Sequence, residues 1–408
     1  MFPSLIIAAA LCGQLEVAVE TLEGARHTGA LTELTEGQVT VTTSDGPRTV
    51  AAEQLLAIRP KNGPTAEAVP VAARVWLTDG SLLPASAYVV ADGVASVATV
   101  GGPSLKIPTA HIAEVRFYSR DSGLDAKFDA IADRELTGDT LVVRRKDETG
   151  KTVALDFLEG VLGDVSQERV RFDFDGDVIN VQRAKLAGLL YYHPPSDEPA
   201  NVACLVETAD GTRVAARRVT LHGEQLALSI AGGGSLGIPL GAVVNLDFSG
   251  GKVRYLSDME PLAWRYTPYI ESPTAQDALA RLFAPRRNQG FDGGPLTLRT
   301  SADSGPVAYA KGLAVCSKTT LEYAAPKGYA RLRAVVGMDG EARELGAVRL
   351  EIYGDSRRLF AEEICSGDEP VPLDLDVAGF ERIRIVVDYG TNLDIADQVL
   401  LCQLRLTK

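Results

Sequence analysis

Side chains that commonly carry out catalysis are scattered through this 408-residue chain. Its four histidines stand singly, without the paired spacing that indicates a zinc site; they are His27, His111, His193 and His222. Gly233–Gly237 formally fits Gly-x-Ser-x-Gly, but a nucleophile elbow requires a strand, a turn, a helix and a later histidine. Pro239 follows closely and no histidine comes after it. We therefore expect a hairpin loop in this segment.

Acidic residues are the second class of candidates for chemistry. Asp173, Asp175 and Asp177 alternate along one segment, but this segment lacks the distal glutamate that completes an EF-hand calcium loop. Asp175-Gly176 is instead expected to be a tight turn. A glycosidase needs only two carboxylates, but with 54 Asp and Glu residues the sequence nominates no particular pair. We expect no enzymatic activity, and an enzyme with an unrecognised site is the least favoured alternative.

Composition and charge narrow both the fold class and the partners. The formal net charge of −13 disfavours nucleic acid, because affinity for phosphate backbones comes from Lys and Arg. The 39 Gly and 21 Pro, together with short runs of alternating apolar and polar residues, favour an all-β fold with many turns. No later segment is apolar enough to insert in a membrane. Sugars or other proteins remain as partners.

The first residues predict export, and the cysteines leave disulfides open. Met1–Gly13 is a short apolar run that ends in small residues, so 1–18 is predicted to be a signal peptide. The alternative is a buried first strand. Acylation of Cys12 is disfavoured because Leu11 precedes it. Beyond this segment the cysteines permit disulfides in an oxidising compartment, but the sequence does not choose their pairing; they are Cys204, Cys316, Cys365 and Cys402.

The first two-thirds of the chain contain a loose internal repeat. Its clearest copy, Val75–Phe117, predicts short strands separated by Asp-Gly turns. Units of about 50 residues are barely large enough for a core of their own, and curling the sheet into a barrel would protect its edges. The strand pattern resembles small SH3-like or Sm-like β barrels in architecture only. The four predicted repeats cover 19–62, 71–119, 128–194 and 201–250.

The last third carries six sequence blocks in a recognisable order. They are Tyr309–Val315, Arg331–Asp339, Gly346–Asp355, Pro370–Gly379, Arg382–Asp388 and Asp394–Asp397. With these blocks, 253–408 resembles NPCBM, the "novel putative carbohydrate-binding module" of exported bacterial proteins. A linker at 253–292 is expected to lead into it. The resemblance implies a galactose-binding-like jelly roll, a β-sandwich of two antiparallel sheets. The alternation of Val348, Leu350 and Ile352 with polar residues fits such a sandwich independently.

The resemblance also points to a candidate site. Cys316 stands where the family commonly has His, and Gln398 stands where it commonly has Trp after Asp-x-Ala-Asp. We expect Asp339, Asp394, Asp397 and Gln398 to bind a carbohydrate, or the carboxylates to hold a structural Ca²⁺. No other cofactor is expected. The alternative assigns these carboxylates to turns and loops at strand ends.

The sequence therefore predicts an exported, non-catalytic protein that is secreted, periplasmic or at the bacterial cell surface. Its expected partner is a polysaccharide or glycan, or a cell-surface protein. The main alternative is a structural, protein-docking module that has lost sugar binding. An aromatic-lined concave patch would favour the first function, and a flat apolar patch the second. Trp76 and Trp264 are candidate stacking platforms, although a tryptophan is more often part of a core.

Overall fold

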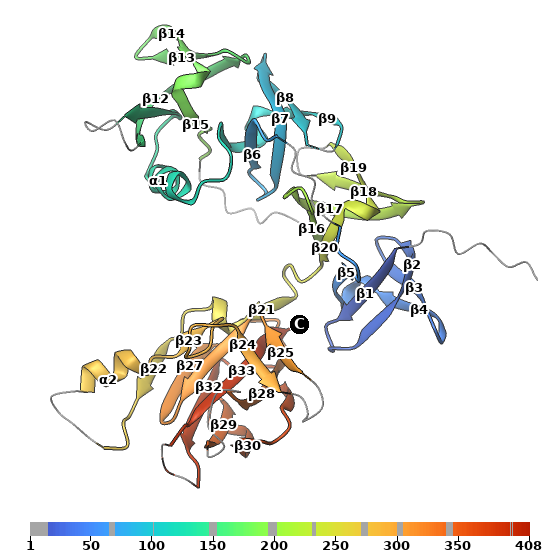
Figure 1. Ribbon diagram of the computed structural model, residues 1–408, viewed down its shortest axis with the longest axis vertical. Helices are drawn as coiled ribbons and strands as arrows, with labels where there is room; N and C mark the ends of the chain where they lie inside the picture. The colour runs from blue at the N-terminus through green and yellow to red at the C-terminus, as the bar shows by residue number, and fades with distance from the viewer. Residues whose placement is uncertain are drawn as a thin grey trace, which may run out of the picture. The chain divides into compact units, whose positions relative to one another are not determined.

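The structure is a computed structural model that describes residues 15–64, 70–100, 102–146, 153–194, 202–230, 234–270, 276–299, 305–339, 346–391, 393 and 395–408. The chain forms two compact units, Met1–Gly250 and Gly251–Lys408. Both are built from β-strands, and each described unit contains one α-helix (Figure 1). The predicted all-β fold is confirmed.

The first unit contains four successive groups of five strands. The first group is β1 (Glu16–Thr21), β2 (Arg26–Leu34), β3 (Gln38–Thr43), β4 (Gly46–Ala51) and β5 (Leu55–Pro60). The second is β6 (Ala73–Leu77), β7 (Leu82–Ala91), β8 (Val94–Thr99), β9 (Ser104–Pro108) and β10 (Ile112–Arg116). The third is β11 (Asp139–Lys146), β12 (Val153–Val165), β13 (Arg169–Phe174), β14 (Asp177–Gln182) and β15 (Leu186–Leu190). The fourth is β16 (Cys204–Thr208), β17 (Arg213–His222), β18 (Gln225–Ile230), β19 (Ser235–Pro239) and β20 (Val243–Asp247).

All four groups share one antiparallel topology. The first strand pairs with both the second and the fifth, and hairpins continue from the second strand to the fourth. Asp175 and Gly176 both have positive φ, as a tight hairpin turn requires. Ser235 begins β19 and pairs with Ser229, so the Gly-x-Ser-x-Gly match belongs to a hairpin. A single 3-10 turn precedes each fifth strand; the four turns are η1 (Ala52–Gln54), η2 (Thr109–His111), η3 (Arg183–Lys185) and η4 (Leu240–Ala242).

Strand pairing also joins the groups to one another. The fifth strands pair across groups, β5 with β20 and β10 with β15, and β7 contacts both β12 and β17. One cluster of buried side chains runs through all four groups, from Val17 to Phe248. Because a 50-residue unit buries too little apolar surface to be secure alone, this shared core stabilises the four groups together.

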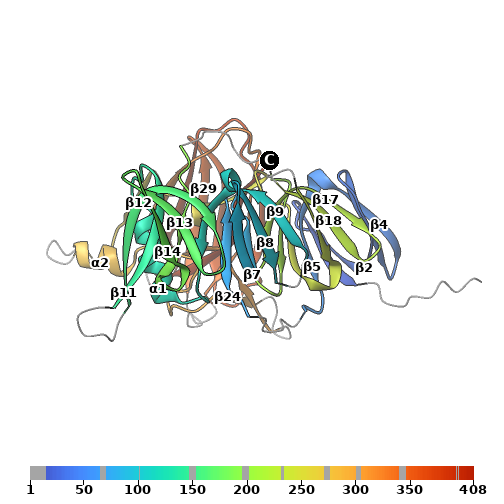
Figure 2. The same cartoon turned by 90° about the horizontal axis from the view of Figure 1, so that it is seen from above.

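A helix that the sequence analysis did not predict supports the third group. This helix, α1 (Ser122–Ala132), begins at Asp121, whose side chain accepts hydrogen bonds from the Gly123 and Leu124 N–H groups. Phe128 and Ile131 bury the inner face of α1 beside Val142, Ala187 and Leu190. The helix lies beside β12 (Figures 1 and 2). The expected start of the third repeat at residue 128 falls inside α1.

The predicted signal peptide, 1–18, overlaps the first strand of the structure. Residues 1–14, which make up most of the predicted signal peptide, lie outside the described residues. β1 begins at Glu16, and both Val17 and Ala18 are buried in it. A boundary after residue 18 would remove half of a strand that pairs with β2 and β5.

The second unit is a sandwich of two antiparallel sheets. One sheet has the order β23-β26-β33-β28-β31, with β21 also paired to β33, and the other has the order β22-β27-β32-β29-β30. The bounds are β21 (Val253–Tyr255), β22 (Ala263–Tyr266), β23 (Arg286–Arg287), β24 (Leu296–Arg299), β25 (Pro306–Tyr309), β26 (Gly312–Cys316), β27 (Thr319–Ala324), β28 (Arg331–Met338), β29 (Ala347–Gly354), β30 (Arg357–Cys365), β31 (Val371–Asp376), β32 (Arg382–Tyr389) and β33 (Gln398–Thr407), with η5 (Leu256–Asp258) and α2 (Gln276–Leu282) between strands.

The alternation read from the sequence produces the core of this sandwich. Val348, Leu350 and Ile352 are fully buried between the sheets, where they belong to one cluster with residues of β26, β28 and β33. The β24–β25 hairpin covers the other side of β26 and β33 through Leu296 and Leu298. This arrangement is the jelly-roll β-sandwich that the NPCBM resemblance implies.

The segment expected to be a linker is part of the sandwich. Within 253–292, β21 pairs with β33, β22 with β27, and β23 with β26. Each strand supplies only two to four residues, which is too short to show an alternating pattern in the sequence. The four cysteines of the described residues form no disulfide.

Candidate functional site

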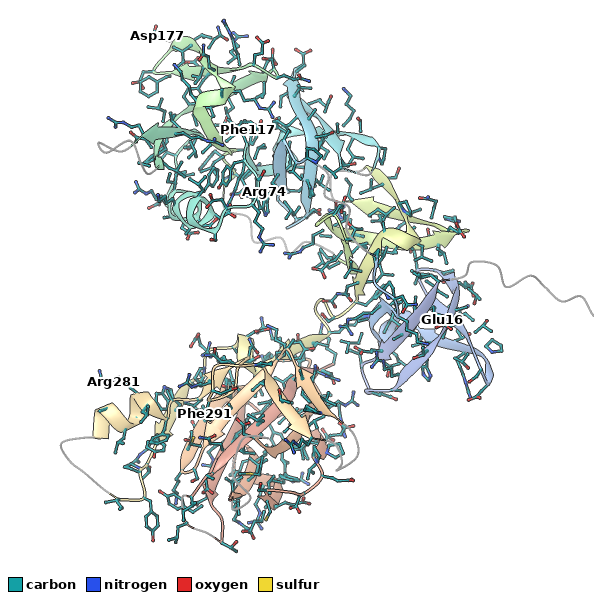
Figure 3. The ribbon with its side chains drawn as sticks, in the orientation of Figure 1. Glu16, Arg74, Phe117, Asp177, Arg281 and Phe291 are labelled. Carbon is teal, nitrogen blue, oxygen red and sulfur yellow. The ribbon has the colours of Figure 1, made fainter. Side chains whose placement is uncertain are left out.

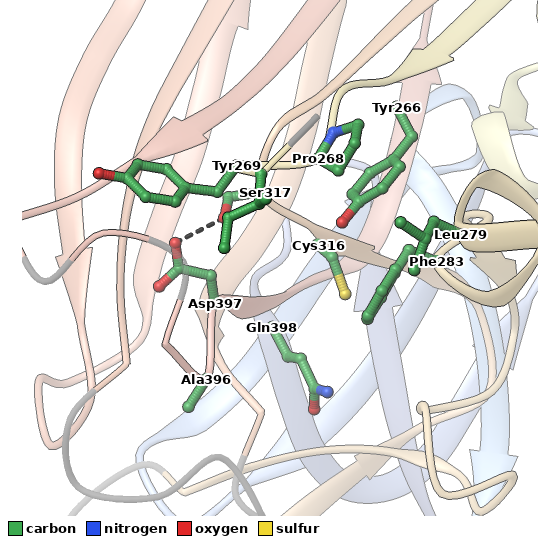
Figure 4. A pocket seen from close by; sticks show the side chains of 11 residues that line it. Tyr266, Pro268, Tyr269, Leu279, Phe283, Cys316, Ser317, Ala396, Asp397 and Gln398 are labelled. Atoms are coloured by element: carbon green, nitrogen blue, oxygen red, sulfur yellow. Dashed lines mark hydrogen bonds between the residues drawn. The ribbon is translucent and has the colours of Figure 1, made fainter. Parts of the chain in front are cut away.

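A cavity of about 270 Å³ opens at one end of the sandwich. It lies between the segment after β22, helix α2, the end of β26 and the start of β33 (Figure 4). Its lining combines aromatic, aliphatic and polar side chains: Tyr266, Pro268, Tyr269, Ile270, Leu279, Phe283, Cys316, Ser317, Ala396, Asp397 and Gln398.

Aromatic side chains form one wall of this pocket. The rings of Tyr266, at the end of β22, and Phe283, just after α2, stack with their centroids 5.2 Å apart. Leu279 lies one helical turn before Phe283 and faces the same cavity. Figure 4 shows these side chains on the same side of the pocket. Stacked rings at this separation form a stable pair, and both residues line the cavity with apolar surface.

The segment that carries Tyr269 is held against the second sheet. The Thr267 N–H donates to the Lys318 carbonyl, and the Tyr389 hydroxyl donates to the Thr267 carbonyl, both at 2.9 Å. The Tyr269 ring meets the Tyr389 ring edge-on, with centroids 5.3 Å apart. These contacts fix the position of Tyr269 at the mouth of the pocket.

A buried carboxylate lies opposite the aromatic wall. Asp397 is 4% exposed and accepts a hydrogen bond of 2.6 Å from the Ser317 hydroxyl, drawn in Figure 4. Its other oxygen accepts from the Ala347 N–H at 3.4 Å, and its carbonyl accepts from the Ser317 N–H at 3.2 Å. Ala396 precedes it with φ +58°, a left-handed conformation that costs a non-glycine residue about 1–3 kcal/mol. The surrounding contacts therefore hold Asp397 in one orientation.

The structure brings together three of the four predicted site residues. Asp397 and Gln398 line the pocket. The Asp339 N–H donates to the Gln398 carbonyl at 2.9 Å, which puts Asp339, the residue after β28, beside them, although its side chain does not line the cavity. Asp394 lies outside the described residues.

Cys316, at the position where the family commonly has His, lines the pocket beside Gln398. Burial, with the negative charges of Asp397 and Asp339, raises the pKa of its thiol to about 12. At neutral pH the side chain is therefore a protonated thiol, and thiolate is the form that acts as a nucleophile or metal ligand. Cys316 therefore contributes a small, largely apolar surface with a weak S–H donor to the pocket.

Among the described residues, no group of three or more His, Cys, Asp and Glu side chains is arranged to hold a metal ion. The predicted calcium ligand Asp394 is not among the described residues. Among the same residues, no helix has the length and apolar character needed to cross a bilayer.

The aromatic residues of the pocket were missed by the sequence analysis. The segment interpreted as a linker supplies Tyr266, Tyr269 and Phe283. The candidate site was instead predicted from the positions where the family commonly has His and Trp. Three aromatic residues within 18 positions of an otherwise irregular segment were the available signal. The structure thus supplies aromatic faces to the pocket from a different part of the chain.

Trp76 belongs to a network of charges in the first unit. Arg74 and Arg116 lie over its ring, 5.2 and 4.6 Å from the centroid. Arg74, labelled in Figure 3, and Arg116 both bind the carboxylate of Asp125 on α1, with N–O distances of 2.6 and 2.9 Å. This cluster attaches α1 to β6 and β10, and its cations already cover the indole. Trp76 is therefore a structural residue.

Comparison with known proteins identifies the second unit. Residues 255–407 match the family model of the NPCBM/NEW2 domain, and the predicted recognition is confirmed. A comparison with curated proteins found no match.

Solved structures of CBM51 modules are among those similar to this chain. A CBM51 of Clostridium perfringens GH95, in complex with methyl-galactose, is 19% identical; the match covers 38% of this chain and 99% of that one, with TM-score 0.33. The CBM51-2 and INT domains of C. perfringens ZmpB, with GlcNAc, are 16% identical over 47% and 37% of the two chains, also with TM-score 0.33. Tandem CBM51 modules of a Streptococcus pneumoniae family 98 glycoside hydrolase are 10% identical over 96% and 88%, with TM-score 0.32.

Proposed function

We propose that the NPCBM domain at 255–407 binds the terminal sugar of a glycan in the pocket beside Asp397. The observation that carries this proposal is the meeting of aromatic faces with a fixed carboxylate and an amide in one cavity. A pyranose ring has an apolar side that packs on aromatic rings and a rim of hydroxyls that needs hydrogen-bond partners. Tyr266 and Phe283 match the first requirement, and Asp397 and Gln398 match the second.

The size of the cavity favours a single ring. Its volume of about 270 Å³ lies just below the range of roughly 300–1,000 Å³ typical of pockets for drug-sized ligands. A terminal sugar fits this space better than a polysaccharide chain that passes through it. The ligand we propose is therefore the non-reducing end of a glycan.

The pocket supports binding without catalysis. Retaining and inverting glycosidases both use two carboxyl groups that flank the scissile bond. Among the described residues that line the cavity, Asp397 is the one carboxylate, and Ser317 and Ala347 hold it in place. The neighbouring thiol of Cys316 stays protonated at neutral pH because its pKa is raised to about 12.

The same proposal includes export to the bacterial surface, periplasm or medium, where such glycans occur. The apolar run of Met1–Gly13 supports export. We also propose that Asp394 helps to bind a structural Ca²⁺, since carboxylate oxygens are ligands that suit Ca²⁺.

A glycan array probed with the full-length protein tests this function. We expect retention of glycans that share one terminal sugar, and at least about a tenfold loss of affinity in Tyr266→Ala, which removes one ring of the stacked pair. Val307→Ala is a matched control, because Val307 is an exposed apolar residue on β25 outside the pocket. Binding to no glycan, or equal binding by Tyr266→Ala and wild type, would contradict the proposal.

Protein docking is a second candidate, supported by apolar side chains near the pocket. Ile270 lines the mouth and is 77% exposed, and Ile395 is exposed next to Ala396. Exposed apolar groups of this kind often mark protein interaction sites. This alternative would be favoured if the wild-type protein bound no glycan but bound a surface protein, and if Ile270→Ser abolished the binding of that protein.

A further inference from the structure

Trp264 is an exposed tryptophan on the same strand as the pocket residue Tyr266. Its side chain is 42% exposed, whereas Trp76 is covered by two arginines. Trp264 pairs with Leu321 and Tyr266 with Thr319, so both project from the same face of β22. β22 is the outer strand of its sheet, with β27 as its neighbour. The indole is therefore open to solvent at the edge of the sandwich.

Trp264 continues a row of apolar side chains that begins in the pocket. Leu262 precedes it by two residues and is 57% exposed, and Tyr266 follows it by two residues and lines the cavity. Residues two apart on a strand are separated by about 6.6 Å, which is close to the length of one pyranose ring. Leu282, at the end of α2 beside the pocket residue Phe283, is also exposed. Exposed apolar side chains thus occupy the alternate positions that lead along the chain from Leu262 through Trp264 to Tyr266 in the pocket.

A charged pair stands at the other end of this row. Glu260 accepts two hydrogen bonds of 2.8 Å from the guanidinium of Arg287, and its side chain is exposed. The segment from Glu260 to Tyr266 therefore presents polar groups, an indole face and the pocket in that order along the chain. A sugar chain has matching chemistry, because each ring offers one apolar side and several hydroxyls.

We propose that Trp264 forms a second sugar subsite, in which the penultimate residue of the glycan stacks on the indole while the terminal residue occupies the pocket. This inference rests on the proposed function of the pocket. The ligand is then at least a disaccharide. Because only the second sugar ring contacts Trp264, this residue gives the end of a glycan a higher affinity than a free monosaccharide. The linkage that brings the second ring toward β22 is then preferred over linkages that direct it into solvent.

Isothermal titration of the full-length protein tests the subsite. The probes are methyl glycosides of galactose, glucose, mannose and N-acetylglucosamine, together with the disaccharides that end in each of these sugars. For the sugar that binds, we expect at least one matched disaccharide to bind more tightly than the glycoside. Trp264→Ala should lower the affinity for that disaccharide by about three- to tenfold and leave the affinity for the methyl glycoside unchanged. Trp264→Phe, which keeps an aromatic ring, should bind the disaccharide nearly as tightly as wild type. Val307→Ala should alter neither affinity.

The outcomes separate this inference from the proposed function. Equal effects of Trp264→Ala on glycoside and disaccharide, or no effect on either, would overturn the subsite while leaving the pocket in place. Failure of all probes to bind wild type would contradict both. A fluorescence readout is available because the chain has only two tryptophans. In Trp76→Phe, the emission of Trp264 should shift to the blue with the disaccharide and not with the glycoside, and an unchanged spectrum with a bound disaccharide would also overturn the subsite.

Discussion

Two carboxylates that face Arg116 should respond to pH in opposite directions. Asp125 accepts hydrogen bonds from Arg74, Arg116 and Tyr118, and these bonds outweigh its partial burial and lower its pKa from 3.8 to about 2. Glu114 also binds Arg116, but its burial is the larger effect and raises its pKa above 4.5. One carboxylate therefore favours the folded state when ionised, and the other when protonated.

The size of the Asp125 effect follows from its pKa. The lowering of this pKa from 3.8 to about 2 corresponds to about 2.5 kcal/mol, because each tenfold change in proton affinity is worth about 1.4 kcal/mol. Since the folded-state pKa lies below the unfolded value, this stabilisation is present above pH 4 and disappears as the pH falls toward 2. Asp125→Asn should therefore lower the free energy of unfolding by about 2.5 kcal/mol at pH 7, and the difference from wild type should shrink toward zero near pH 2.

Glu114→Gln provides the matched control. Because the folded-state pKa of Glu114 is raised, its contribution to stability is present below pH 4.5 and is lost as the pH rises through the folded-state pKa. The cost of Glu114→Gln at pH 7 should then be smaller than that of Asp125→Asn, and it should not diminish on acidification.

Trp76 makes the measurement local to the first unit. In a Trp264→Phe background it is the remaining tryptophan, and its ring lies against Arg74 and Arg116. Urea unfolding followed by Trp76 emission between pH 2.5 and 7 gives the free energy for each variant. A loss in Asp125→Asn that is the same at pH 2.5 and pH 7 would refute the assignment of a lowered pKa to this carboxylate.

Three further predictions concern the site and the fold. Ser317→Ala removes the 2.6 Å hydrogen bond to Asp397 and should weaken glycan binding about three- to tenfold. Calorimetry measures the affinity, and circular dichroism should show an intact fold. Unchanged affinity would mean that Asp397 does not need this hydrogen bond to bind the glycan. In native protein at pH 8, iodoacetamide should label the partly exposed Cys365 before the buried Cys316 and Cys402. The pKa values of these two buried thiols are both raised to about 12, so little reactive thiolate is present. Mass spectrometry that finds Cys316 and Cys402 labelled first would contradict their burial. Gly188→Ala should destabilise the first unit by about 1–3 kcal/mol in urea unfolding, because a Cβ there would clash with the Val115 carbonyl and the Phe128 ring. In the control Gly237→Ala, the new Cβ meets only the end of the Gln225 side chain, so the cost should be less than about 1 kcal/mol.

Local patterns account for what the sequence predicted about the fold. Val348, Leu350 and Ile352 alternate with polar neighbours, and the structure buries all three. Asp175-Gly176 predicted a turn because its backbone conformation depends on those two residues alone. Asp397 and Gln398 could be nominated from the sequence because they belong to a motif that is continuous in the chain.

Features that depend on distant contacts were not predictable in this way. The pairing of β5 with β20 joins strands of the first and fourth groups, which are far apart in the sequence, and neither strand alone identifies its partner. Helix α1 is short, and its inner face becomes identifiable only where Val142 and Ala187 cover it. Tyr266 and Phe283 became neighbours because short strands of the supposed linker joined both sheets. The family motif therefore did not identify the aromatic half of the pocket, although the aromatic residues are close together in the sequence.

A crystal structure of the full-length protein with the disaccharide selected by titration is the most direct test of the central claim. The account predicts a terminal sugar ring in the cavity, packed on Tyr266 or Phe283, with its hydroxyls within hydrogen-bond distance of Asp397 or Gln398. A bound sugar at any other position on the protein, with this cavity empty, would contradict it.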